Sequence, residues 1–300
     1  MSRPFSRPFA PMPKSLTTPI EPGSAATREP SGQDRSAYAD PFRRFEVAVA
    51  TSSGTQHEVN EDAHSAPGGA GRLFVVADGV GGGAMAQTAS RLLVAQLHDA
   101  LEAEPLTADS VRAAMHDADR AIAATIARVT DRPGAATVAL CAPVDASAAR
   151  WLIAWVGDCR VYRLAMGADP GIDLLTRDDT FGNLGEAPPP GGSPDDPARM
   201  VGNGAIAAAN VALHDLAAGD ALAVCSDGVH KFVEVADWCR LLAQPLPLAR
   251  ACDELIRVAR GNGSRDDATV LLLQRLPPAS DGLRWIGRSA VPAGGQRRER

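Results

Sequence analysis

Acidic residues stand beside most of the apolar segments of this chain. The apolar runs LFVVAD, WLIAWVGD and ALAVCSD each end in an aspartate, and two acidic pairs adjoin other strand-like segments, in VNEDAH and SRDDATVLLL. These residues are Asp78, Asp158, Asp227, Glu61-Asp62 and Asp266-Asp267. An isolated Asp-Gly after a strand is usually a turn, because Asp tolerates turn geometry and Gly supplies positive φ. As a set, we expect them to gather at one rim of a pair of sheets.

Carboxylates that converge repel one another, and we expect no lysine near them to pair with them. A hard divalent cation offsets the repulsion, since Mg²⁺ and Mn²⁺ favour carboxylate, carbonyl and water oxygens. Two such ions about 3.5–4 Å apart lower the pKa of a bridging water and hold a phosphoryl group for attack. Gly79 follows Asp78, and without a Cβ its carbonyl can approach an ion closely. The residues predict a two-metal hydrolytic site.

The elements that must position these carboxylates follow from the hydrophobic pattern. Strands are predicted near 45–51, 73–78, 136–142, 151–156, 160–165, 205–213, 221–225 and 268–276. Apolar residues at helical spacing predict helices that include 89–101, 111–129 and 246–260. A segment rich in Gly, Pro and Asp, about 166–203, is predicted to be a long loop. Because the strands are grouped, we predict an α+β fold with two antiparallel sheets and helices outside.

Composition narrows the function classes. With 300 residues and 45% apolar residues the chain can fill a large core, and its net charge of −6 argues against nucleic-acid binding. Five scattered cysteines without a CxxC pair fit a reducing compartment. No apolar stretch approaches the roughly 20 residues that span a bilayer, so we expect no membrane partner and a cytoplasmic location. Residues 1–42 and 277–300 lack periodicity and are predicted to be disordered, on either side of one domain at 43–276.

Five motifs occur in one order along the chain. They are NEDA (60–63), ADGVGG (77–82), VGDCRVYRL (156–164), AAGDALAVCSDGV (217–229) and GSRDDATVLLL (263–273). With these motifs the chain resembles the metal-dependent protein phosphatases (PPM), the type 2C serine/threonine phosphatase family, in a bacterial form. The resemblance covers about 45–275 and implies a four-layer αββα sandwich. It also implies hydrolysis of phosphoserine and phosphothreonine on a protein substrate, in bacteria often opposing a Ser/Thr kinase.

The resemblance further implies a set of metal ligands. Their positions here are Asp78, Gly79, Asp227, Asp266, Glu61 and Asp158. Asp78 would bridge two Mn²⁺ or Mg²⁺ ions, the Gly79 carbonyl would bind one of them, and Glu61 would act through a water. Asp158 matches the position of a third, weaker ion, and Asp62 would lie just outside the ligands. The nucleophile would be the bridging water, so no covalent phosphoenzyme is expected.

One position departs from the family pattern. The family usually carries an Arg four residues before the Glu of NED, where it grips the substrate phosphate, and here that position is His57. An Arg offers a permanently charged, bidentate fork, whereas a His offers one donor and a pH-dependent charge. We expect weaker phosphate binding and a lower pH optimum, or else a His57 without a role in an exposed loop. Arg160 and Arg265 could substitute, although structural roles are expected for both.

Three functions remain in competition. An active phosphoprotein phosphatase leads, because every expected ligand is present. A pseudophosphatase that keeps the fold and binds a partner with weak or no turnover is favoured by His57 and disfavoured by the intact acidic set. A phosphatase acting on a small metabolite is the third, and the proline-rich segment EAPPPGGSPDDPARMVGN (186–203) neither supports nor excludes it.

Overall fold

A computed structural model describes most of the chain between Asp34 and Pro277. The described residues are 34–39 (backbone only), 44–55, 57–66, 72–82, 84–102, 106–131, 134–166, 170–204, 206 and 208–277. All of them belong to one compact unit, Gly32–Arg300. The predicted disordered segments, 1–42 and 277–300, lie outside the described residues except for 34–39 and Pro277. No helix within the described ranges combines the length and apolarity needed to cross a membrane.

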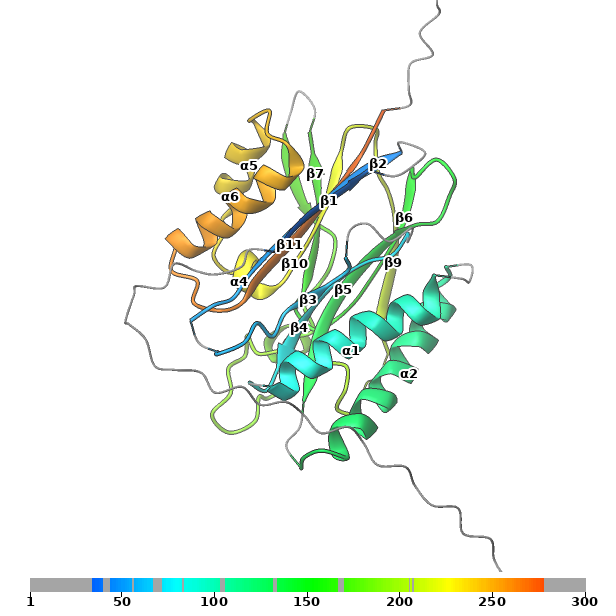
Figure 1. Ribbon diagram of the computed structural model, residues 1–300, viewed down its shortest axis with the longest axis vertical. Coiled ribbons are helices and arrows are strands. Elements are labelled where there is room, and N and C mark those ends of the chain that lie inside the picture. The colour runs from blue at the N-terminus through cyan, green and yellow to red at the C-terminus, as the bar shows by residue number, and fades with distance from the viewer. Residues whose placement is uncertain are drawn as a thin grey trace, which may run out of the picture. The chain divides into compact units, whose positions relative to one another are not determined.

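Two antiparallel sheets form the centre of this unit (Figure 1). The first sheet has the order β1 (Asp34–Ala39), β2 (Phe45–Ser52), β11 (Ala268–Arg275), β10 (Ala221–Cys225), β7 (Arg160–Ala165), β8 (Gly171–Leu174). The second has the order β3 (Ala63–His64), β4 (Phe74–Val80), β5 (Ala135–Pro143), β6 (Arg150–Val156), β9 (Asn210–Asp215). Every strand pair is antiparallel, as the grouping of strands in the sequence predicts.

Helices cover the outer face of each sheet. Figure 1 shows α1 (Ala84–Leu101) and α2 (Ala108–Ala127) on the side of the second sheet, and α5 (Val235–Leu242) and α6 (Leu248–Gly261) on the side of the first. Two short helices, α3 (Phe181–Leu184) and α4 (Asp227–His230), lie in connections. The predicted four-layer αββα sandwich is confirmed.

Three apolar layers hold the sandwich together. One lies between the second sheet and α1 and α2, and another lies between the first sheet and α5 and α6. The third fills the space between the sheets and contains an aromatic cluster, in which Phe45 meets Phe74 at 5.6 Å and Trp151 at 5.8 Å between ring centroids. Both rings meet Phe45 edge to face, a favoured geometry for aromatic pairs. This central layer fixes how the two sheets face each other at their rims.

Several elements differ from the predictions. Residues 34–39, placed in the disordered N-terminal segment, form the edge strand β1, which pairs with β2 through its backbone. The predicted loop 166–203 contains β8 and α3, and backbone hydrogen bonds such as Gly182 N to Pro194 O (2.7 Å) fold it into an ordered flap. The strand predicted over 205–213 begins only at Asn210. Strand β8 and helix α3 have four residues each, too few for periodicity to reveal them.

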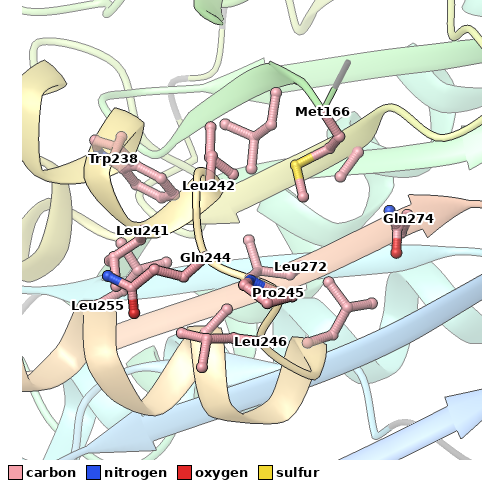
Figure 2. A pocket seen from close by; sticks show the side chains of 14 residues that line it. Met166, Trp238, Leu241, Leu242, Gln244, Pro245, Leu246, Leu255, Leu272 and Gln274 are labelled. Carbon is pink, nitrogen blue, oxygen red and sulfur yellow. The ribbon is translucent and has the colours of Figure 1, made fainter. Parts of the chain in front are cut away.

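A cavity of about 200 Å³ lies between the first sheet and the connection from α5 to α6. Figure 2 shows its apolar walls, which include Trp238, Leu246, Leu255 and Leu272. No residue of the predicted metal site lines it. It is therefore separate from the carboxylates.

Candidate active site

A second cavity, of about 250 Å³, opens at one rim of the sandwich. It is lined by every residue predicted as a metal ligand: Asp78, Gly79, Asp227, Asp266, Glu61 and Asp158. His57 and Lys231 also line it, together with Asp196 and Pro197 from the flap. Asp62 does not line this cavity. The rim therefore brings together acidic residues that are up to 205 positions apart in the sequence, from Glu61 to Asp266.

Asp78 lies in β4, opposite Thr137 of β5. The strand runs two residues further, to Val80, so Asp78 does not end it as the sequence suggested. Gly79 has a packing role that sequence analysis missed. A Cβ at this position would come within 2.5 Å of the Ala86 carbonyl oxygen in α1 and 2.9 Å of the Glu61 carbonyl oxygen. Glycine is needed here because α1 and the Glu61 segment press directly onto β4.

The electrostatics of Asp78 reflect the convergence of charge. Burial raises the pKa of Asp78 well above its usual value, and the charges of Asp62, Asp227, Asp158 and Asp266 raise it further. A carboxyl group with four negative neighbours favours its protonated form unless a cation is bound. Cation binding and proton release are therefore coupled at this residue.

Asp267 organises the segment that carries Glu61. Its Oδ1 accepts a hydrogen bond from Gly54 N at 2.7 Å, and its Oδ2 accepts one from Glu61 N at 2.6 Å. Ser90 Oγ of α1 donates to the Glu61 carbonyl at 2.5 Å. Both oxygens of Asp267 are thus occupied by backbone donors, which assigns it a positioning role that the sequence did not reveal.

Asp62 is buried beside the site. Its Oδ2 accepts a hydrogen bond from Ser226 Oγ at 2.8 Å, and its Oδ1 makes no hydrogen bond within the described part of the chain. Burial raises the pKa of Asp62 to about 8, against the opposing hydrogen bonds of Thr269 and Ser226. A buried carboxylate with an unoccupied oxygen fits a position next to bound cations, because such a charge is costly unless it is paired.

His57 faces the carboxylates. Its Nδ1 lies 3.5 Å from Glu61 Oε1, and a ring nitrogen lies within 4.8 Å of carboxylate oxygens of Asp266 and Asp267. The side chain is 31% exposed, so it reaches both the acidic cluster and solvent. Its place in the cavity wall would allow it to contact a phosphate group bound there.

The two arginines considered as substitutes lie elsewhere. Arg160 donates three hydrogen bonds to the carboxylate of Asp178, at 2.7 to 3.1 Å. Arg265 is exposed, and neither arginine lines the cavity. The structural role expected for Arg160 is therefore visible as a half-buried ion pair.

The expectation that no lysine stands near the carboxylates is wrong. Lys231 Nζ donates to Asp227 Oδ2 at 2.7 Å and lies 3.5 Å from Asp158 Oδ2. Burial raises the pKa of Asp158 to about 6, the charge of Asp227 adds to this, and Lys231 opposes it. Burial acts to raise the pKa of Asp227, but the charge and hydrogen bond of Lys231 outweigh this effect. The pKa of Asp227 therefore lies below its usual value. Lys231 follows Asp227 by four residues, a spacing that puts two residues on one face of a helix, but the sequence suggested only a turn at this place.

A cation site fits these residues. Several carboxylates line the cavity, and one of their oxygens, Asp227 Oδ1, is buried without a hydrogen bond in the described part of the chain. The same holds for Asp62 Oδ1, which lies beside the cavity. The donor set is entirely oxygen apart from His57, which matches Mg²⁺ and Mn²⁺ better than softer metals.

Comparisons with known proteins agree with this arrangement. The family described as Protein phosphatase 2C matches residues 50–267. The serine/threonine protein phosphatase PstP of Mycobacterium tuberculosis is 32% identical over 216 residues, which are 67% of this chain and 40% of PstP. This chain therefore spans less than half the length of the curated relative.

Solved structures show the same fold. The catalytic domain of PstP in complex with two manganese ions is 26% identical, with a TM-score of 0.65 over 78% of this chain and 99% of that one. The PPM Ser-Thr phosphatase MsPP from Mycobacterium smegmatis, in complex with cacodylate, is 25% identical, with a TM-score of 0.63 over 77% and 98% of the two chains. The motifs, the αββα sandwich and the acidic rim have one common explanation: this chain belongs to the protein phosphatase 2C family.

Proposed function

We propose that this protein is a metal-dependent phosphatase that hydrolyses phosphoserine and phosphothreonine in proteins. The observation that carries the proposal is the gathering of Asp78, Asp227, Asp266, Glu61 and Asp158 around one solvent-open cavity. Two bound Mn²⁺ or Mg²⁺ ions would supply Lewis acidity and a water of lowered pKa at this place. The rest of the chemistry depends on how the protein's own residues hold the ions, orient the substrate phosphate and transfer protons.

We assign the ion ligands as follows. Asp78 would be shared by both ions, the Gly79 carbonyl would bind one of them, and Glu61 would contribute through a water. Asp227 and Asp266 would hold the second ion, and Asp227 Oδ1 is buried and lacks a hydrogen bond in the described part of the chain. Asp62 lies outside the ligands.

His57 is proposed to contact the substrate phosphate from the cavity wall. Its imidazole is held beside Glu61 and donates one hydrogen bond where an arginine would donate two. We therefore expect a higher KM than for a variant with Arg at this position. Because a protonated imidazole binds an anion better, activity should favour lower pH.

The shape of the cavity supports a protein as the substrate rather than a small molecule that would be enclosed. It is open to solvent, and the flap residues Asp196 and Pro197 form one wall, so a phosphorylated side chain can enter while its backbone stays outside. The substrate would be one phosphorylated by a cognate Ser/Thr kinase. Five free cysteines, four of them buried, support a reducing, cytoplasmic location. We place the limits of the phosphatase domain at β1 and β11.

The test is phosphate release from a phosphothreonine peptide by the full chain. We expect release with Mn²⁺, none with EDTA, and a loss of at least about 100-fold in Asp78→Asn, because removal of one preorganised electrostatic group typically costs 10²–10³ in kcat. Asp99→Asn, which changes an exposed aspartate of α1, is the matched control and should retain full activity.

Two further outcomes separate the competing functions. No release from the wild type at pH 6 to 9, combined with tight binding of the phosphopeptide, would replace the enzyme with a pseudophosphatase, and His57→Arg would then be tested for recovered turnover. Release from para-nitrophenyl phosphate or a sugar phosphate with a far higher kcat/KM than from any peptide would favour a small-molecule phosphatase.

A further inference from the structure

Lys231 lies between two carboxylates that come from separate segments. Its Nζ donates a hydrogen bond to Asp227 Oδ2 at 2.7 Å and lies 3.5 Å from Asp158 Oδ2. Asp227 follows β10, and Asp158 precedes β7, the strand that pairs with β10. The Asp158 side chain is only 4% exposed, whereas Lys231 is 41% exposed. The lysine therefore reaches from the mouth of the cavity inward to a buried acid.

The two oxygens of Asp227 have different surroundings. Oδ2 binds the ammonium, while Oδ1 is buried and makes no hydrogen bond within the described residues. Asp227 can therefore hold an ion through Oδ1 and keep its contact with Lys231 through Oδ2. The lysine therefore leaves Asp227 Oδ1 available to an ion, and it lies between Asp227 and Asp158.

The chemical type of this residue is unusual for the chain. Lysine and arginine together number 30, but only Lys14 and Lys231 are lysines. An ammonium is a compact point charge with three donors, whereas a guanidinium is a planar fork. Of the two basic side chains, the ammonium is the closer match in size and shape to a metal ion between two carboxylates.

We propose that the Lys231 ammonium takes the place of a third divalent cation between Asp158 and Asp227. The inference rests on the proposed function. It assigns the ammonium to the place where a third, weaker ion is expected at Asp158. The protein then holds two ions and keeps a fixed positive charge at the edge of the cavity. A divalent ion at this place would have to expel the ammonium into solvent and break both of its contacts with the carboxylates.

The test counts bound ions. Native mass spectrometry and titration calorimetry with MnCl₂ are applied to the full chain as wild type, Lys231→Met, Lys231→Met/Asp158→Asn, and Arg240→Met. The last variant is a matched control, because it removes the positive charge of an exposed ion pair with Asp237 outside the cavity. We expect two ions in the wild type, three in Lys231→Met, and two again in the double variant and the control.

Each other result is decisive as well. Three ions in the wild type, or two in Lys231→Met, would overturn this inference while leaving the two-metal function standing. A wild type that binds no Mn²⁺ would overturn both. If Lys231→Met does not fold, as judged by circular dichroism, Asp158→Asn decides alone. Its ion count stays equal to that of the wild type if Asp158 pairs with the ammonium, and falls by one if Asp158 holds an ion.

Discussion

Removal of the metal should make the stability of this protein strongly dependent on pH through Asp62. The perturbation is EDTA treatment of the wild type and of Asp62→Asn, which has the shape of the protonated acid. Asp62 is 6% exposed, and burial raises its pKa from 3.8 to about 8 in the metal-free fold. Asn cannot ionise, so the difference between the two proteins reports the ionisation of Asp62 together with its effect on the neighbouring Asp78.

The direction follows from proton linkage. Between pH 3.8 and about 8 the folded protein holds a proton on Asp62 that the unfolded chain has released. The free energy of unfolding of the metal-free wild type therefore falls as the pH rises through this window. From pH 5 to pH 8 the loss from Asp62 alone is roughly 4 kcal/mol, at 1.36 kcal/mol for each pH unit of the shift. For a domain of this size that corresponds to a fall in Tm of about 10 °C.

The assay is differential scanning calorimetry at several pH values from 5 to 8.5, with EDTA and separately with Mn²⁺. We expect the Tm of Asp62→Asn minus that of the wild type to rise with pH in EDTA. Mn²⁺ should abolish most of this rise, because bound cations favour the ionised acid. His230, whose pKa burial lowers to about 4, titrates in both proteins and cancels in the difference.

One result would refute the reasoning. If the difference in Tm between Asp62→Asn and the metal-free wild type stays constant from pH 5 to 8.5, Asp62 does not carry a raised pKa. Asp99→Asn, at an exposed site on α1, is the control and should show no such trend.

Three further predictions concern packing and positioning, all measured by urea unfolding of the metal-free protein. Gly228→Ala should cost about 3 kcal/mol, because its Cβ would overlap the Asp267 carbonyl oxygen. An unchanged midpoint would contradict that contact. Arg160→Met should cost about 3 kcal/mol, because it strands the buried Asp178 carboxylate. Arg160→Met/Asp178→Asn should recover part of the loss, and no recovery would reject the pair. Ala251→Leu should gain about 1 kcal/mol by filling the apolar cavity without changing Mn²⁺-dependent phosphate release, and a loss of stability would mean that the cavity cannot accept the side chain.

The sequence predicted the central strands and the layer order because these depend on long apolar runs. The acidic rim was also predictable, since aspartates at or near the ends of antiparallel strands meet at one edge. Edge elements were not predictable in the same way. Strand β1, DRSAYA, has little apolar alternation and pairs with β2 through its backbone. Formation of β1 depends on its pairing with β2, which the residues of β1 alone do not indicate.

The side-chain pairs of the site were the least predictable part. The pairing of Lys231 with Asp227 requires a helical turn, α4, directly after β10, where an Asp-Gly pair suggested only a turn. Asp266 and Asp267 are adjacent and chemically identical, yet only the first lines the cavity while the second binds two backbone N–H groups. Alternation of side chains along an extended segment separates such neighbours, but the direction of each is set by the fold.

The acidic rim also has a mechanical consequence. Asp78 belongs to the second sheet, while Asp227 and Asp266 adjoin strands of the first. Without counter-ions, ionisation of Asp78 would place like charges on the two sheets and push this edge of the sandwich apart, whereas ions shared between the sheets would hold the edge together. The cations would then serve the role that a cross-link serves in a secreted protein, in a chain whose five cysteines are all free. Depletion of manganese or magnesium would loosen the open end of the molecule at the same time as it stops the chemistry.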